Sequence, residues 1–141
     1  MKVSILISGA ALATLLATGA APAPLDDDPI EVDILELTSI DYEEGKELPK
    51  KIRDLDGKKI VISGYMQSQP KKDVNQFLIV GNSCQCAGRP LVQHFVEVTL
   101  DDDKTTGYKP GQLTFIGTLE VGEVKEDGFV KSIYRLKGDF F

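Results

Sequence analysis

The side chains best suited to chemistry lie close together in one stretch, FLIVGNSCQCAGRPLVQHFVEV, which spans residues 77–98. It contains both cysteines of the chain, Cys84 and Cys86, and the single histidine, His94. In extended backbone, residues i and i+2 point to the same side, so the two thiols can face one ion. Two thiolates and an imidazole are ligands that suit Zn²⁺ or a copper ion. The first prediction is therefore a site for zinc or copper.

A closed zinc site needs a fourth ligand, and the best candidate in the sequence is Met66. Met66 ends a predicted strand that is expected to pair with residues 76–80, just before the cysteines. Its thioether would favour copper, because copper accepts soft sulfur ligands. The predicted metal ligands are thus Cys84, Cys86, His94 and Met66.

Two other interpretations of the same residues stay open. A disulfide across one intervening residue closes a strained, easily reduced ring, which suits a thiol–disulfide exchange protein that works through Cys84 and Cys86. In that case His94 or Arg89 would stabilise the reactive thiolate. The third interpretation is structural, with an inert cysteine pair and with His94 as a hydrogen-bonded core residue.

Other familiar catalytic patterns are missing from the sequence. No serine lies in a GxSxG turn, and there is no glycine-rich phosphate loop. The carboxylates are not flanked by apolar residues that would raise a pKa for acid–base catalysis. Four aromatic residues are candidates for a ligand-stacking surface, although core packing explains most of them: Tyr65, Phe77, Phe95 and Tyr108. The sequence therefore predicts a binding or accessory module rather than an enzyme.

Five segments with strand character must position these residues: 58–66, 76–80, 92–100, 112–124 and 128–138. They are rich in β-branched and apolar residues and are separated by turn residues. The third segment alternates well and places His94 on the same apolar face as Val96 and Val98.

Glycines inside two of these segments, Gly64 and Gly117, indicate bends or bulges, and Asp127-Gly128 indicates a hairpin turn. A short, strongly curved sheet favours closure, because closure hides edges that would otherwise pair with other chains. We therefore predict an all-β fold, a small five-stranded, partly closed antiparallel OB-like barrel over residues 48–141. An open β-sandwich is the alternative.

The first residues have the order of a secretory signal peptide. Residues 1–23 run from a lysine through a short apolar stretch to small residues, and cleavage is expected between Ala20 and Leu25. The apolar stretch is shorter than the roughly 20 residues that a membrane span needs. We therefore expect a periplasmic or secreted protein without stable membrane insertion.

An N-terminal extension is expected between the signal peptide and the barrel, over residues 24–47. Alternation at residues 30–34 predicts a short edge strand, after which the pattern breaks. A charged loop follows, and then a short helical turn from Pro49 to Asp54, since proline favours the start of a helix.

The formal net charge of −6 argues against a nucleic-acid partner, whose phosphates would repel the protein. The expected partners are a metal ion or an envelope protein. The latter would dock on an exposed sheet edge or loop, and the protein would then act without chemistry of its own.

Several segments together resemble an uncharacterised family of bacterial exported domains, catalogued as a domain of unknown function. The matching segments are LPKKIRDLDGKKIVISGYM (48–66), QFLIVGNSCQC (76–86), QHFVEV (93–98) and FIGTLEVGE (115–123). The shared layout is an LDGK entry into the first strand, GYM at its end, and an FLIV-type strand that leads into a cysteine-bearing loop. The resemblance implies a small β-barrel outside the cytoplasm and brings no established activity.

Overall fold

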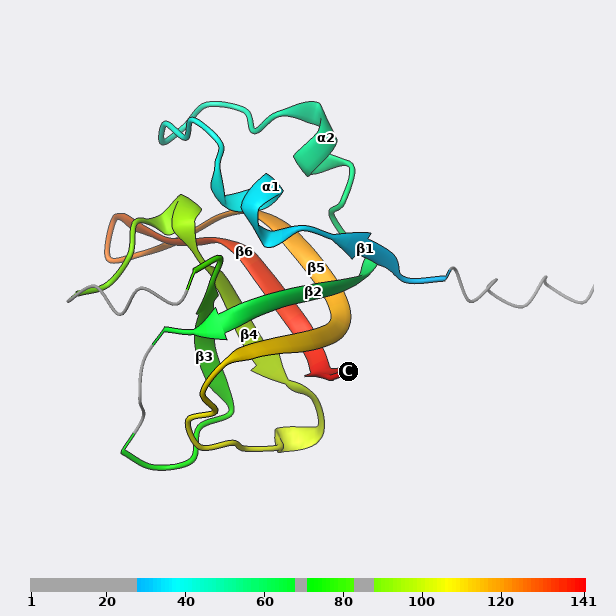
Figure 1. Cartoon of the computed structure of the whole chain (residues 1–141). Coiled ribbons are helices and arrows are strands. Elements are labelled where there is room, and N and C mark those ends of the chain that lie inside the picture. Colours follow the sequence, from blue (N-terminus) through cyan, green and yellow to red (C-terminus); the bar gives the residue numbers. More distant parts are fainter. Residues whose placement is uncertain (1–27, 68–70, 83–87) are drawn as a thin grey trace, which may run out of the picture.

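A computed structural model describes residues 28–67, 71–82 and 88–141, and most of its regular structure is β-strand (Figure 1). The elements in chain order are β1 (Ile30–Val32), α1 (Ile34–Thr38), α2 (Lys50–Arg53), β2 (Lys59–Met66), β3 (Gln76–Val80), the 3₁₀ turn η1 (Val92–His94), β4 (Val96–Leu100), the 3₁₀ turn η2 (Asp101–Asp103), β5 (Gln112–Glu126) and β6 (Phe129–Phe140). The predicted helical turn is α2, flanked by Pro49 and Asp54. Both cysteines and the predicted signal peptide lie outside the described residues. Each helix in the described ranges is too short to cross a membrane.

All six strands belong to one sheet, and its hydrogen bonding closes into a ring. The strand order is β1-β2-β3-β4-β6-β5, and β2 pairs in addition with β5. Within the predicted barrel β4 and β6 are parallel, whereas the sequence predicted an antiparallel barrel, and the edge strand β1 is parallel to β2. Parallel neighbours need a long connection. The whole of β5 lies between β4 and β6 in the chain and provides it.

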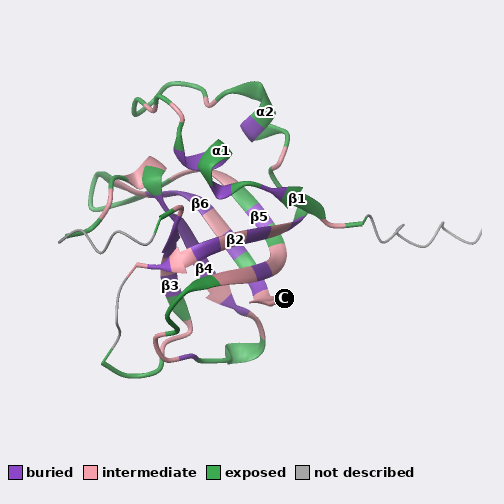
Figure 2. Cartoon of the chain, in the orientation of Figure 1, coloured by how far each residue is buried: buried purple, intermediate pink, exposed green. Residues whose placement is uncertain are grey.

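Buried apolar residues form a core inside the ring, and Figure 2 shows the buried positions along its strands. Along β2 every second residue is buried, and Ile60 and Ile62 have 0% and 1% of their surface exposed. Phe115 on β5 packs between two other aromatic rings, with centroid distances of 5.7 Å to Phe77 and 5.1 Å to Phe140. Burial of each such side chain contributes about 1.5–3 kcal/mol, so this interior is the main source of stability.

The third predicted strand is shorter than expected, and this changes the position of His94. β4 begins at Val96, and η1 precedes it, with a hydrogen bond from the His94 N–H to the Leu91 carbonyl of 2.8 Å. The prediction that His94 shares the apolar face of a strand is therefore wrong, as is its interpretation as a core residue, because the side chain is exposed. Phe95, which is fully buried, is the first residue of this segment to enter the core.

Helix α1 closes one end of the ring. Asp33 caps it, because its side chain accepts a backbone N–H bond in the first turn. Ile34 and Leu37 are buried in the core, and a side chain at Gly64 would lie 3.0 Å from the Ile34 Cδ1. The Tyr134 hydroxyl donates a 2.8 Å hydrogen bond to the Leu37 carbonyl. The predicted alternation breaks at residue 34 because this helix begins there.

β5 and β6 approach closely where Gly117 pairs with Gly138. A Cβ on Gly138 would lie 2.0 Å from the Ile116 carbonyl oxygen, and one on Gly117 would lie 2.3 Å from the Lys137 carbonyl oxygen. These oxygens belong to the backbone of a hydrogen-bonded pair of strands and cannot move aside without disturbing it. Both positions therefore require glycine, and this contact accompanies the strong curvature of β5 (Figure 1).

Gly138→Ala should lower the free energy of unfolding by about 3 kcal/mol, because overpacking against backbone forces the two strands apart. Urea denaturation followed by circular dichroism measures this change. Gly107→Ala is the matched control, since its new Cβ would meet only the Asp73 Oδ1, at 3.1 Å. Equal unfolding midpoints for the two variants would contradict the prediction.

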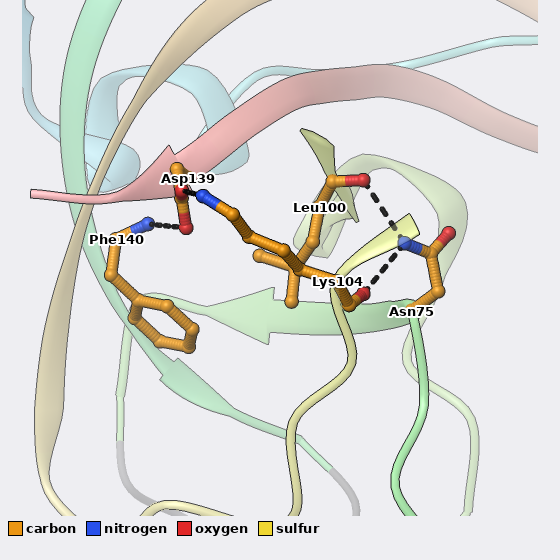
Figure 3. Close-up of polar contacts among 5 residues, drawn as sticks. All are labelled: Asn75, Leu100, Lys104, Asp139 and Phe140. Carbon is orange, nitrogen blue, oxygen red and sulfur yellow. Dashed lines mark hydrogen bonds and ion pairs between the residues drawn. The ribbon is translucent and has the colours of Figure 1, made fainter. Parts of the chain in front are cut away.

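A polar cluster joins three segments at the end of the ring opposite α1 (Figures 1 and 3). The Asn75 Nδ2 donates to the carbonyls of Leu100 and Lys104, at 3.0 Å and 2.8 Å. The Lys104 ammonium pairs with Asp139, which also accepts a 2.9 Å hydrogen bond from the Phe140 N–H. The ammonium, and then this backbone N–H, hold the pKa of the Asp139 carboxyl below its ordinary value.

The lowered pKa of Asp139 predicts a specific acid sensitivity. A carboxyl whose pKa is lower in the folded state stabilises the fold above its unfolded pKa, about 4, and loses this contribution as the pH falls through the folded value. Asp139→Asn should therefore flatten the fall of the melting temperature below about pH 4. Asp54→Asn, which removes a carboxylate from an exposed ion pair with Lys50, controls for the lost charge. The prediction would be contradicted if the melting temperature of Asp139→Asn fell below about pH 4 as steeply as that of the wild type.

Candidate functional site

A cavity of about 530 Å³ lies where α1, the ends of β2 and β3, and the 88–94 segment meet. Its volume is within the usual range for sites that bind small molecules. It forms because α1 packs directly against the end of β3, where a side chain at Gly81 would lie 2.6 Å from the Leu35 Cδ2. Glycine at this position thus lets α1 approach and shape one wall of the cavity.

His94 lines this cavity from η1, with its side chain exposed. The turn fixes its backbone through the hydrogen bond to Leu91, and the buried Phe95 holds the next residue in the core. The imidazole is thus presented at a cavity wall from a position anchored on both sides, which suits a ligand or a proton-transfer group.

Two other lining residues, Asn82 and Gly88, lie at the two ends of the described chain around the cysteines. Cys84 and Cys86 themselves lie outside the described residues. The segment that carries the predicted thiols therefore leaves the described structure at this cavity and re-enters it at the same cavity. The Gln67 Nε2 donates a long, 3.5 Å hydrogen bond to the Gly88 carbonyl oxygen, which connects the end of β2 to one of these two residues.

Arg89 also lines the cavity, and two contacts hold its guanidinium. The Nη2 donates a 3.1 Å hydrogen bond to the Lys131 carbonyl, and the Cζ lies 5.4 Å from the centre of the Phe95 ring. The second distance is within the range of a cation–π interaction. The guanidinium is thus restrained beside Lys131, and Arg89 also lines a second cavity together with Lys131, Glu126 and Asp127.

Met66, the fourth predicted ligand, lies in the core and does not line the cavity. Its side chain is 4% exposed, and its sulfur accepts a 3.4 Å hydrogen bond from the Lys109 N–H. Gln67, the next residue, points to the opposite side of the strand and does line the cavity. The structure thus places His94 at the same cavity as Asn82 and Gly88 and keeps the thioether of Met66 inside the ring.

Within the described part of the chain, no group of three histidine, cysteine or acidic side chains is arranged to hold a metal ion. The aromatic surface proposed from the sequence also differs from expectation. Phe77 and Phe95 are buried, so these two rings pack in the core and cannot stack on an external ligand. Tyr65 and Tyr108 are half-buried.

Sequence reasoning did not identify Gln67 or Ser39 as residues of this cavity. Neither lies in a motif, and they come from the end of β2 and the residue after α1. The short helix that brings Ser39 here has a recognisable signal in Asp33, a common helix-capping residue, but its docking site on the ring is a tertiary property.

The comparison with protein-family models gives no match, and the comparison with curated proteins gives none either. Among solved structures, the chain is similar to the crystal structure of a DUF3299 family protein from Pseudomonas aeruginosa PAO1. The TM-score is 0.49 and the sequence identity 16%, and the match covers 81% of this chain and 97% of that one. The neighbour belongs to a family of unknown function, so we take no activity from it.

The exposure of His94 predicts its chemical reactivity. In the folded protein, diethyl pyrocarbonate should modify this single histidine as fast as it does in the protein unfolded in urea. Mass spectrometry of tryptic peptides measures the adduct on the peptide that contains His94. Protection in the folded, metal-free protein would contradict an exposed imidazole at the cavity.

Proposed function

We propose that this protein is an exported binding module that captures a soft metal ion, zinc or copper, with Cys84, Cys86 and His94. The observation that carries the proposal is that His94, Asn82 and Gly88 line one cavity. Each cysteine is two residues from one of these flanking residues. The stretch of sequence that carries the proposed thiolate ligands is therefore joined at both ends to residues of this cavity.

The charge at the cavity is compatible with thiolate ligands. Arg89 supplies a positive charge beside the segment that carries the cysteines, and such a charge favours the thiolate form that binds metals. Two thiolates with one Cu⁺ carry a net charge of −1, which a guanidinium would stabilise. The same two thiolates with Zn²⁺ are neutral, so Arg89 favours copper within the proposal.

The proposed set contains three ligands, and Met66 is left as a residue to test. Its sulfur already accepts a hydrogen bond, and its side chain faces the interior of the ring. A metal bound by Met66 would require this side chain to leave the core. On Zn²⁺, three protein ligands leave one of the four positions open, and three-coordinate Cu⁺ can accept a further ligand during exchange, so the set suits a carrier or delivery protein that passes the ion to an envelope partner.

The scaffold in this proposal is an OB-like barrel. The ring of pairings β2–β3–β4–β6–β5–β2, with β4 and β6 parallel, supports this assignment. Export to the periplasm or the medium rests on the order of residues 1–23 alone.

Native mass spectrometry of the reduced protein tests metal capture. With Cu⁺ or Zn²⁺ added, we expect one bound ion per chain and no bound ion in Cys84→Ser. His94→Ala should bind at least about tenfold more weakly, since even the loss of an outer-shell partner weakens metal sites by that factor. The absence of any bound ion in the wild type would refute the proposal.

Two variants serve as controls in the same experiment. Ser39→Ala alters a cavity side chain that is not a proposed ligand, so it should bind as the wild type does. Met66→Leu should also retain the ion. A loss confined to Met66→Leu, in a folded protein, would extend the ligand set to the thioether.

The position of Arg89 also favours a second candidate, a thiol–disulfide exchange protein that uses Cys84 and Cys86. A fixed guanidinium lowers the pKa of a nearby thiol and so raises its reactivity at neutral pH. The mass of the wild-type protein distinguishes the two functions. A wild-type protein that takes up no metal but loses two hydrogens in a glutathione redox buffer, and regains them on reduction, would favour exchange.

A further inference from the structure

We propose that the cavity lined by Arg89 and His94 binds the carboxylate of a small aliphatic acid. This inference goes beyond metal capture, because it uses described residues alone and needs neither cysteine. Its basis is the contrast between the charge of the chain and the charge of this cavity.

The chain is acidic, with 22 aspartate and glutamate residues against 16 lysine and arginine residues. Nevertheless, none of the described residues that line the cavity carries a carboxylate. Its charged side chain is Arg89, and further hydrogen-bond donors are His94, Gln67 and Ser39. A site with a positive charge, several hydrogen-bond donors and no carboxylate among its described residues favours an anion.

Arg89 is held in a way that suits anion recognition. Its guanidinium has five N–H donors, and the hydrogen bond to the Lys131 carbonyl uses the Nη2 side. Contact with the Phe95 ring restricts its rotation. A planar guanidinium that is restrained in this way loses little entropy when it forms two parallel hydrogen bonds to a carboxylate.

Four apolar residues also line the cavity, beside the polar Thr38 and Asn82, and they indicate the rest of the ligand. Leu35, Val80, Pro90 and Leu91 line it, and Leu35 and Leu91 are 50% and 62% exposed. Exposed leucines beside a cationic group are typical of a site that buries an apolar chain and pairs its charged end. A short aliphatic tail fits this surface better than a second charged group would.

Titration of ¹⁵N-labelled protein with hexanoate, followed by NMR, tests the inference. Hexanol and hexylammonium have the same chain with no charge and with the opposite charge, and inorganic phosphate is an anion without a chain. We expect hexanoate to shift the resonances of Arg89 and His94 and to bind more tightly than the other three compounds. Equal affinity for hexanoate and hexanol would overturn the role of charge, and tighter binding of phosphate would overturn the role of the aliphatic tail.

Variants of the protein locate the interaction. Arg89→Gln should weaken hexanoate binding about tenfold or more, because a hydrogen bond to a charged group contributes about that much to binding. Arg53→Gln is the matched control, since it removes an exposed arginine of α2 that pairs with Glu47 outside the cavity. Equal weakening by the two variants would overturn the assignment to Arg89.

Leu35→Asp gives a test that leaves the contacts of Arg89 intact. It introduces a negative charge at an exposed position of the cavity wall and should abolish hexanoate binding by repulsion. Unchanged binding in this folded variant would refute the site. The Cys84→Ser, Cys86→Ser double variant should bind hexanoate as the wild type does, even though metal capture would be lost. The two proposals can therefore fail separately.

Discussion

β2 pairs along both of its edges, and the closed sheet depends on this double pairing. One edge meets β5 over seven residue pairs, from Lys59 to Tyr65, and the other meets β1 and then β3. Such a strand has no free edge for pairing with another chain. Its inward residues are consequently enclosed on all sides, which is why alternate residues of β2 are buried. The tight contact of Gly117 with Gly138 belongs to the same closure, since residues 115–118 of β5 pair with β2 on one edge and with β6 on the other.

The closed sheet has two open ends, and different kinds of contact cover them. At one end, the Asn75–Lys104–Asp139 cluster ties loops and a strand terminus together with polar contacts. At the other end, α1 inserts Ile34 and Leu37 among the core residues. A five-residue helix cannot cover that end completely, so a cavity remains beside it. The candidate site is therefore a consequence of how the ring is closed by α1.

The charge distribution gives this cavity its chemical character. The surface of the protein is rich in carboxylates, many of which pair with lysines, as in the contacts of Glu36 with Lys51 and of Glu44 with Lys125. Such exposed pairs contribute little to stability, and they leave the surface well solvated. In the cavity, Arg89 instead contacts a carbonyl and an aromatic ring, and neither contact neutralises its charge. The proposed metal capture, thiol exchange and carboxylate binding would all draw on this positive charge, since a guanidinium stabilises thiolates, anionic metal complexes and carboxylates alike.

Local sequence patterns determined most of the strands of this protein. Runs of β-branched and apolar residues bounded by turn residues over 58–66, 76–80, 112–124 and 128–138 predict β2, β3, β5 and β6 closely, because each strand contributes buried residues to the core. The Asp127-Gly128 turn is equally local, and both residues have positive φ. Apolar alternation also suggested that residues 92–94 were strand. It failed there because a 3₁₀ turn leads into β4, with Phe95 as the first buried residue.

The tertiary structure alone decided the parallel pairs, the insertion of α1 and the composition of the cavity. Each depends on contacts between segments far apart in the chain, which a local pattern does not record. The sequence identified His94 and Arg89 as candidate functional residues because an imidazole can bind metals and a guanidinium can stabilise a thiolate. That they share a cavity with Gln67 and Ser39 follows only from the packing of α1 against Gly64 and Gly81, where the absence of a side chain lets the helix come close.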